Sequence, residues 1–199
     1  MANSDKTGST VTKTLVDTVK KVLSGSKSPV IIAIDGNCGS GKTFYSSKLA
    51  ELFCADVIHC DDFFLPKEMR TPERLNEIGG NVHYERLRGL LSLVRSGKLP
   101  LTYMAYNCST EGYEEKTVNK TDVIIVEGSY ALHPTLNEFY DLKILLKVNS
   151  RTQYERLLKR EGSGTVNFID KWIPLENRYF AALDTTDCIV IDTSKNETN

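Results

Sequence analysis

A glycine-rich segment, GNCGSGKT, contains the residues of this chain whose types and spacing are best suited to chemistry. It follows the apolar run at residues 30–34 and has one glycine, four further residues and then Gly-Lys-Thr. Glycines permit positive backbone angles, so consecutive N–H groups can line one concavity, and a helix beginning there adds its free N–H groups. We therefore predict a phosphate-binding loop. Its residues are Gly36, Asn37, Cys38, Gly39, Ser40, Gly41, Lys42 and Thr43.

Two residues of this loop have specific expected roles. Lys42 can reach the β- and γ-phosphates of a nucleotide, and the Thr43 hydroxyl can ligate Mg²⁺. ATP and Mg²⁺ are thus the expected cofactors. The alternative is a glycine-rich turn with a chance lysine, which the strand–loop–helix context disfavours.

Carboxylates follow two other predicted strands. Asp61 and Asp62 come after residues 56–59, and Glu127 comes after residues 123–126. A carboxylate beside the γ-phosphate can act as general base toward an acceptor hydroxyl. We expect only one aspartate to face the site, because neighbours on an extended chain point in opposite directions; the alternative is that both cap the following turn. Glu127 can hold Mg²⁺ directly or through water, and Asp61 is a further candidate metal ligand.

A basic helix is predicted at residues 150–161, with Tyr154 and Leu158 among the residues facing inward. Arg156 and Arg160 lie four residues apart on one face, and the segment GSGT follows as a flexible break. A basic face beside such a break suits a lid that closes over phosphates, which we place at about residues 161–170. A solvated charged face is the alternative, and Arg151 is a weaker candidate.

The spacing of apolar residues predicts the elements that position this chemistry. Five short apolar runs alternate with helices, which indicates an α/β fold with a mostly parallel five-stranded sheet and helices on both faces. Ligands of such sheets bind at the carboxyl ends of the strands, so the candidate residues should meet in one place. The runs are residues 30–34, 56–59, 123–126, 142–148 and 188–191.

The rest of the chain divides into two parts. Residues 1–28 contain a polar tail, expected to be disordered over residues 1–9, and an amphipathic helix; residues 29–199 form the domain that carries the loop and the lid. The helix after the loop is expected to bury Tyr45, Leu49, Leu52 and Phe53. Within residues 99–120, LTYMAY and EKTV are expected to pair as a hairpin.

Composition excludes several classes of function. With 199 residues and a net charge of -1, the chain has no field favouring nucleic acid, and no apolar run approaches the length of a membrane span. The five cysteines lack CxxC spacing, which indicates reduced thiols in a cytoplasmic protein rather than disulfides or zinc. Oxidation of Cys38, inside the loop, is expected to disturb phosphate binding.

Between about residues 30 and 191 the chain resembles the uridine kinase branch of the phosphoribulokinase/uridine kinase family of P-loop kinases. The resemblance rests on GNCGSGKT, CDDFFLP, GGNVHYERL, VEGSYALHP and the basic helix followed by KWIPLENRYF. It implies the P-loop NTPase fold with a small lid, and ATP-dependent phosphorylation of the ribose 5′-hydroxyl of a pyrimidine nucleoside such as uridine. It assigns the general base to Asp61, the Walker B-like carboxylate to Glu127 and the lid arginines to Arg156 and Arg160.

Two departures from this family concern the acceptor. The family holds the ribose hydroxyls with an aspartate where this chain has His83, and neutral imidazole accepts one hydroxyl proton where a carboxylate accepts two. The family reads the pyrimidine with a Tyr-Asp stretch and a nearby histidine, whereas this chain has Tyr106–Asn107 and no histidine between His83 and His133. The candidate substrate contacts are Asp62, His83, Tyr106 and Arg151.

The leading prediction is a kinase whose partners are a nucleotide and a small hydroxyl acceptor. Pantothenate, nicotinamide riboside or a sugar-like alcohol are alternative acceptors. A nucleotide-driven switch is disfavoured because the chain lacks an Asn-Lys-x-Asp segment for reading guanine. A nucleotide-binding protein without catalysis is a third reading, and a homo-oligomer is compatible with the sequence.

Overall fold

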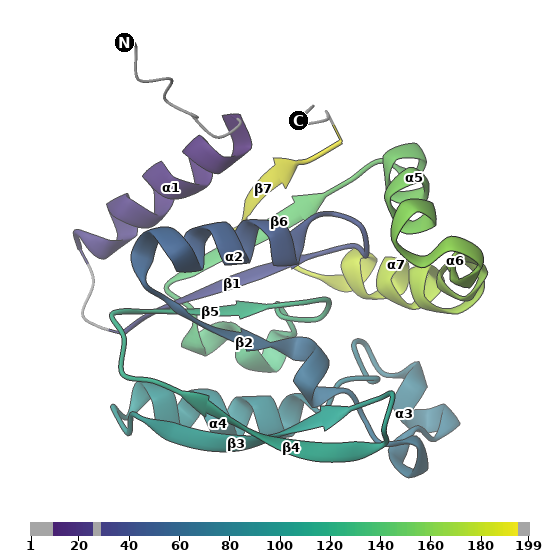
Figure 1. Cartoon of the computed structure of the whole chain (residues 1–199), viewed down its shortest axis with the longest axis horizontal. Helices are drawn as coiled ribbons and strands as arrows, with labels where there is room; N and C mark the ends of the chain where they lie inside the picture. Colours follow the sequence, from purple (N-terminus) through teal and green to yellow (C-terminus); the bar gives the residue numbers. More distant parts are fainter. Residues whose placement is uncertain (1–9, 26–28, 195–199) are drawn as a thin grey trace.

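A parallel sheet of five strands forms the centre of the described part of the chain (Figure 1). The computed structural model describes residues 10–25 and 29–194, and the predicted disordered tail, residues 1–9, lies outside them. Each neighbouring pair of strands is parallel, which confirms the expected sheet. In spatial order the strands are β2 (Asp56–His59), β5 (Val123–Glu127), β1 (Val30–Gly36), β6 (Leu142–Lys147) and β7 (Ile189–Asp192).

Helices cover both faces of this sheet, as predicted. One face packs against α1 and α2, with Leu15 and Leu49 in its core, and the other packs against α4 and α7, with Leu91 and Tyr179 in its core. The two central strands, β1 and β5, are consequently buried at every residue. The helices are α1 (Thr10–Leu23), α2 (Lys42–Phe53), α4 (Tyr84–Arg95) and α7 (Ile173–Ala182).

The expected hairpin is present as a separate two-stranded sheet. β3 (Leu101–Asn107) pairs antiparallel with β4 (Gly112–Val118), and Figure 1 shows the pair running alongside α4. The 3₁₀ turn Cys60–Phe63, which carries both aspartates, contacts β3. Between this turn and α4 lies α3 (Pro72–Asn76), a single short helix. The hairpin thus supports the segment that follows β2.

The lid region is more regular than the sequence indicated. After α5 (Ser150–Glu161), the helical path breaks at the first residue of the GSGT segment, as predicted, and helical turns resume within that segment. Gly162, at φ 57°, ends α5 and lets the chain change direction. A 3₁₀ turn, α6 (Thr165–Asn167) and a π-helical turn (Phe168–Trp172) then lead directly into α7.

Three apolar residues expected inside are exposed instead. Leu52 is 58% exposed, Tyr154 48% and Leu158 47%. The buried faces predicted for these two helices were too wide. Helix α2 buries only the face of Tyr45 and Leu49, and α5 packs beside the phosphate loop rather than flat on the sheet. Among the described helices, none has the length and apolar character needed to cross a bilayer.

Candidate active site

The predicted phosphate loop connects β1 to α2 at the carboxyl end of the sheet. Gly36, Gly39 and Gly41 have positive φ angles of 154°, 76° and 92°. A Cβ atom on Gly36 would lie 2.2 Å from the carbonyl oxygen of Leu146, because β6 passes directly beside it. Glycine is therefore required where β1 ends, both for its backbone angles and for its lack of a side chain.

Lys42 lies over this loop. Its Nζ atom donates hydrogen bonds to the carbonyl oxygens of Gly36, at 2.7 Å, and of Asn37, at 3.1 Å. Because α2 begins at Lys42, the ammonium group and the free N–H groups of the helix share one end of the loop. This arrangement suits an anion such as the phosphates of a nucleotide.

Side chains from the C-terminal half of the chain hold the loop from outside. The carboxylate of Glu176, on α7, accepts a 2.8 Å hydrogen bond from the N–H of Cys38. Gln153 and Arg156, on α5, donate to the carbonyl oxygens of Cys38 and Gly39, both at 2.9 Å. Glu176 and Gln153 were missed from the sequence, because their local pattern is that of ordinary helix residues.

A buried carboxylate lies directly behind the loop. Asp35 is fully buried and accepts hydrogen bonds from the N–H groups of Gly36, Tyr130 and Leu132 and from the hydroxyl of Tyr179. Burial raises the pKa of Asp35 to about 6, while these donors oppose the rise. Asp35 thus ties β1 to the segment after β5 and to α7. The available sequence signal was a charged residue directly between an apolar run and the glycine loop.

The two neighbouring aspartates have different surroundings. Asp62 is buried; its Oδ2 accepts from the Tyr103 hydroxyl and its Oδ1 from the Lys116 ammonium, both at 2.7 Å. Both oxygens are thereby engaged with the hairpin, an arrangement that suits a structural role better than the substrate contact expected from the sequence. The carboxylate of Asp61 has no hydrogen-bond partner among the described residues.

Asp61 lies in the electrostatic field of the loop. Although its side chain reaches solvent, surrounding protein atoms exclude enough water to raise its pKa above the ordinary 3.8. The Lys42 charge lowers this pKa and the Glu127 charge raises it. Asp61 is therefore close to both groups, as expected for the aspartate that faces the site.

Glu127 ends β5 between the loop and β2. Its carboxylate lies 3.4 and 3.5 Å from the hydroxyl of Thr43, and His59 Nδ1 contacts Oε1 at 2.5 Å. This hydrogen bond is the largest cause of the raised pKa of His59. The sheet register explains why the Glu127 carboxylate lies near both the loop and His59, because Glu127 pairs with Ile34 of β1 on one side and with His59 of β2 on the other.

The oxygens of Thr43 and Glu127 fit a magnesium ion that is also bound by a nucleotide. Mg²⁺ prefers oxygen ligands and usually keeps waters and phosphate oxygens beside one or two carboxylates. Within residues 10–25 and 29–194, no group of three or more His, Cys, Asp and Glu side chains could hold a metal. The protein therefore offers a partial site that the phosphates would complete.

The three arginines of α5 have different surroundings. Arg156 donates hydrogen bonds to the carbonyl oxygens of Gly39 and Thr193, so it supports the loop instead of extending from a lid. Arg160 pairs with Glu161. Arg151 is 89% exposed and pairs with Glu155 one turn along α5, so the structure gives it no contact with the site. The cause is the orientation of α5, whose Thr152–Gln153–Leu157 face meets the protein.

The other candidate acceptor contacts lie near the aspartate turn. The N–H of His83 donates to the carbonyl oxygen of Phe63 at 2.6 Å, and its Nδ1 lies 3.0 Å from Glu85. Tyr106 is 5% exposed and packs against Tyr113 in the hairpin. His83 is thus adjacent to the turn of Asp61, whereas Tyr106 is mainly part of the hairpin core.

Comparison with known proteins identifies relatives among nucleoside kinases. No protein-family model matches the chain. Uridine kinase of Ureaplasma parvum serovar 3 is 28% identical over 133 residues, which cover 61% of this chain and 64% of that relative. Uridine kinase of Bacillus cereus is 26% identical over 175 residues, covering 78% and 81%. The chain thus spans less than two thirds of the length of the Ureaplasma relative it matches.

Solved structures agree on the fold. A candidate fructose transport system kinase from Silicibacter sp. TM1040 superimposes with a TM-score of 0.73 at 18% identity, covering 92% of this chain and 100% of that one. A possible uridine kinase from Bacillus stearothermophilus gives a TM-score of 0.68 at 20% identity, covering 90% and 98%. The chain is thus similar in sequence to uridine kinases, and it shares its fold with these two solved structures.

The cysteine of the phosphate loop is shielded from solvent. Cys38 is 7% exposed, and burial and the nearby Glu176 carboxylate raise the pKa of its thiol to about 12. The thiolate is the reactive form of cysteine, so the thiol should be inert in the folded protein. The expected sensitivity of the loop to oxidation therefore lacks support.

Proposed function

We propose that the chain is an ATP-dependent kinase that transfers the γ-phosphoryl group to a hydroxyl group of a small molecule. A pyrimidine nucleoside such as uridine is the first acceptor to test, in view of the relatives. The observation that best supports a kinase is that the Asp61 carboxylate lies free within electrostatic reach of both Lys42 and Glu127.

Each residue then has a distinct task. Lys42 and the N–H groups of the loop bind the phosphates and neutralise charge that develops on the transferred group. Asp61 accepts the proton of the attacking hydroxyl. Thr43 and Glu127 would hold Mg²⁺, which when bound neutralises charge on the phosphate oxygens. Arg160, with its side chain 56% exposed, is our candidate for a cation that approaches from the lid.

The test is ADP release, measured by a coupled assay, with MgATP and a panel of hydroxyl compounds. Uridine, cytidine, pantothenate and nicotinamide riboside belong in the panel, together with simple sugars and hydroxy acids. Acceptor-dependent ADP release with a phosphorylated product is the expected result. ATP binding without turnover would favour a binding protein, and rapid hydrolysis without acceptor would favour a nucleotide-driven switch.

A further inference from the structure

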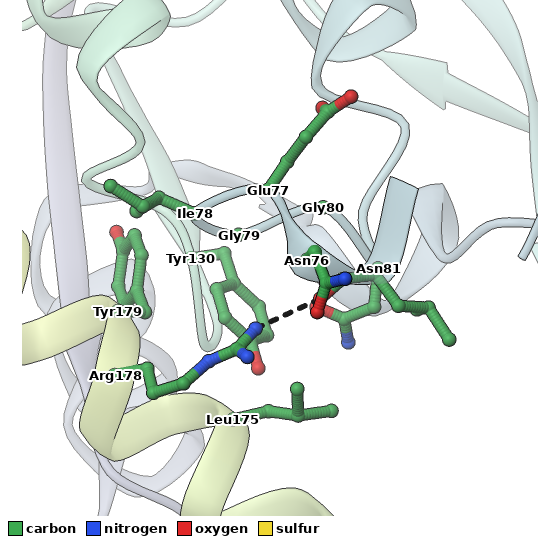
Figure 2. Close-up of a pocket in the computed structure, with 11 residues that line it drawn as sticks. Asn76, Glu77, Ile78, Gly79, Gly80, Asn81, Tyr130, Leu175, Arg178 and Tyr179 are labelled. Carbon is green, nitrogen blue, oxygen red and sulfur yellow. Dashed lines mark hydrogen bonds between the residues drawn. The ribbon is translucent and has the colours of Figure 1, made fainter. Parts of the chain in front are cut away.

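A small cavity lies between residues 75–81, the segment after β5, and α7 (Figure 2). Its volume is about 30 Å³, room for a water-sized group or a small planar group but not for a ring. Asn81, Tyr130 and Arg178 contribute polar groups to its wall. The roles described above use none of these three side chains.

Two of these polar groups are buried without a partner. The Nδ2 atom of Asn81 and the hydroxyl of Tyr130 form no hydrogen bond of good geometry in the described structure, although the Asn81 side chain is close enough to lower the pKa of Tyr130; the two residues are 6% and 3% exposed. Such groups are costly, because they lose water without gaining a protein partner. Figure 2 shows Asn81, Tyr130 and Arg178 among the residues that line this cavity. A ligand in this cavity could satisfy both orphaned groups.

The cavity adjoins the candidate active site, because each wall is tied to it. The N–H of Tyr130 donates to Asp35, immediately before the phosphate loop. The carbonyl oxygen of Asn81 accepts from the N–H of Leu65, four residues after Asp61. Arg178 lies two residues after Glu176, which binds the loop. The cavity is therefore placed to hold a molecule whose hydroxyl group approaches Asp61.

The polar groups of the wall are mainly donors. Asn81 presents its amide N–H₂, and Arg178 has five N–H donors, of which the Nη2 group binds the Leu75 carbonyl oxygen at 2.9 Å. Burial and the charges of Glu176 and Asp35 raise the pKa of Tyr130, and the Asn81 side chain only partly opposes the rise, so the Tyr130 hydroxyl keeps its proton. The acidic residue of the wall, Glu77, is occupied by Arg74 and Tyr84.

We infer that this cavity is an acceptor subsite that binds an oxygen carrying no hydrogen, either a carbonyl or a carboxylate oxygen of the substrate. Three donors and one positive charge match such an oxygen, whereas an amino group would oppose them. The inference rests on the proposed kinase function, since it assigns part of the same substrate. It adds that the kinase selects its substrate at Asn81, Tyr130 and Arg178.

The experiment compares matched acceptors in the coupled ADP assay. Uridine and cytidine differ by a ring carbonyl against an amino group, and glycerate and glyceramide differ by a carboxylate against an amide. Tyr130→Phe removes only the orphaned hydroxyl, so it should fold with an unchanged or higher Tm. Arg178→Ala removes the charge, and Arg151→Ala is the matched control on exposed α5.

For the acceptor that is used, we expect Tyr130→Phe and Arg178→Ala to raise KM at least about tenfold, and Arg151→Ala to leave it unchanged. Loss confined to uridine identifies a carbonyl ligand, and loss confined to glycerate identifies a carboxylate. KM values within about twofold of wild type in both variants, for each acceptor used, would overturn the inference.

Failure of the proposed function is distinguishable from failure of the subsite. If the wild type releases no ADP with any acceptor, the kinase proposal fails, and calorimetry with the same four compounds then decides on the subsite. The subsite is supported if one of these compounds binds to the wild type and Tyr130→Phe weakens that binding at least about tenfold. Absence of binding, or equal binding to both proteins, overturns it.

Discussion

The carboxylate of Glu176 accepts a hydrogen bond from the backbone N–H of Cys38 at 2.8 Å, across 138 residues of sequence. Its second oxygen accepts from the hydroxyl of Ser129 at 2.7 Å, and the residue is only 4% exposed. One side chain of α7 thereby fixes both the phosphate loop and the segment after β5. Because α7 continues directly from the lid region, a movement of that region would shift Glu176 and thereby change the conformation of the loop.

Replacing Glu176 should therefore damage nucleotide binding. Glu176→Ala leaves the N–H of Cys38 buried without an acceptor, so we expect a loss of about 1–3 kcal/mol in the free energy of unfolding and weaker ATP binding. Glu176→Gln keeps one acceptor oxygen and should retain most of both properties. Thermal unfolding and ATP titration of the two variants are the measurements, and unchanged ATP affinity in Glu176→Ala would contradict this role.

Asp61→Asn should separate catalysis from binding. Amide nitrogen cannot accept the proton of a hydroxyl group, so phosphoryl transfer should fall at least ~10²-fold. The carboxylate has no hydrogen-bond partner in the described structure, and Tm and ATP affinity should change little. Single-turnover rates with the accepted substrate provide the measurement. Near-normal transfer would remove Asp61 from the mechanism.

Asp62→Asn is the matched neighbour and should behave in the opposite way. Its carboxylate binds Tyr103 and Lys116, so the substitution weakens the support of the aspartate turn by the hairpin. We expect a loss of about 1–3 kcal/mol in the free energy of unfolding, with a smaller effect on transfer than Asp61→Asn. Equal catalytic losses in both variants would argue against distinct roles.

Lys42→Ala should abolish nucleotide-dependent activity without unfolding the protein. The two hydrogen bonds of Lys42 are made within the loop, so little of the fold depends on them. Lys48→Ala, at an exposed position on the same helix, is the control. ADP release and circular dichroism of both variants test this, and a wild-type rate in Lys42→Ala would exclude the loop from the mechanism.

The pH dependence of transfer should reflect the raised pKa of Asp61. A general base must be deprotonated, and a raised pKa means that protonation removes the base at a higher pH than for an ordinary aspartate. The acidic limb of kcat/KM should thus lie above pH 3.8 and be absent from the residual activity of Asp61→Asn. A limb at or below that pH, or one that persists in the variant, would point to another group.

Thiol labelling should distinguish the cysteines by burial. Cys54 and Cys108 are exposed, whereas Cys38 is buried with a raised pKa. Iodoacetamide followed by mass spectrometry should modify the first two rapidly and Cys38 only after unfolding. Rapid labelling of Cys38 in the folded protein would show that the loop opens more than the structure indicates.

Local sequence patterns were sufficient to predict the elements that depend on interactions between near neighbours in the chain. The glycine loop, the strand at residues 56–59 and the hairpin were predicted because backbone angles and alternating burial act between near neighbours. Leu52, Tyr154 and Leu158 were placed wrongly, because the exposed width of a helix depends on what packs against it. The break at GSGT was predicted at the right place, because Gly162 adopts a positive φ angle that favours glycine, but the helical turns that follow it were not predicted.

The sequence by itself determined the phosphate loop, the α/β fold and the carboxylates that follow β2 and β5. Through the family resemblance it assigned the general base to Asp61, but it could not show that Asp62 binds the hairpin, because the partners Tyr103 and Lys116 are 41 and 54 residues away. Nor could it reveal His59 beside Glu127, Glu176 on the loop, or the cavity of Asn81, Tyr130 and Arg178. Those relationships join segments distant in sequence, and only the packing of the sheet and helices brings their side chains within reach.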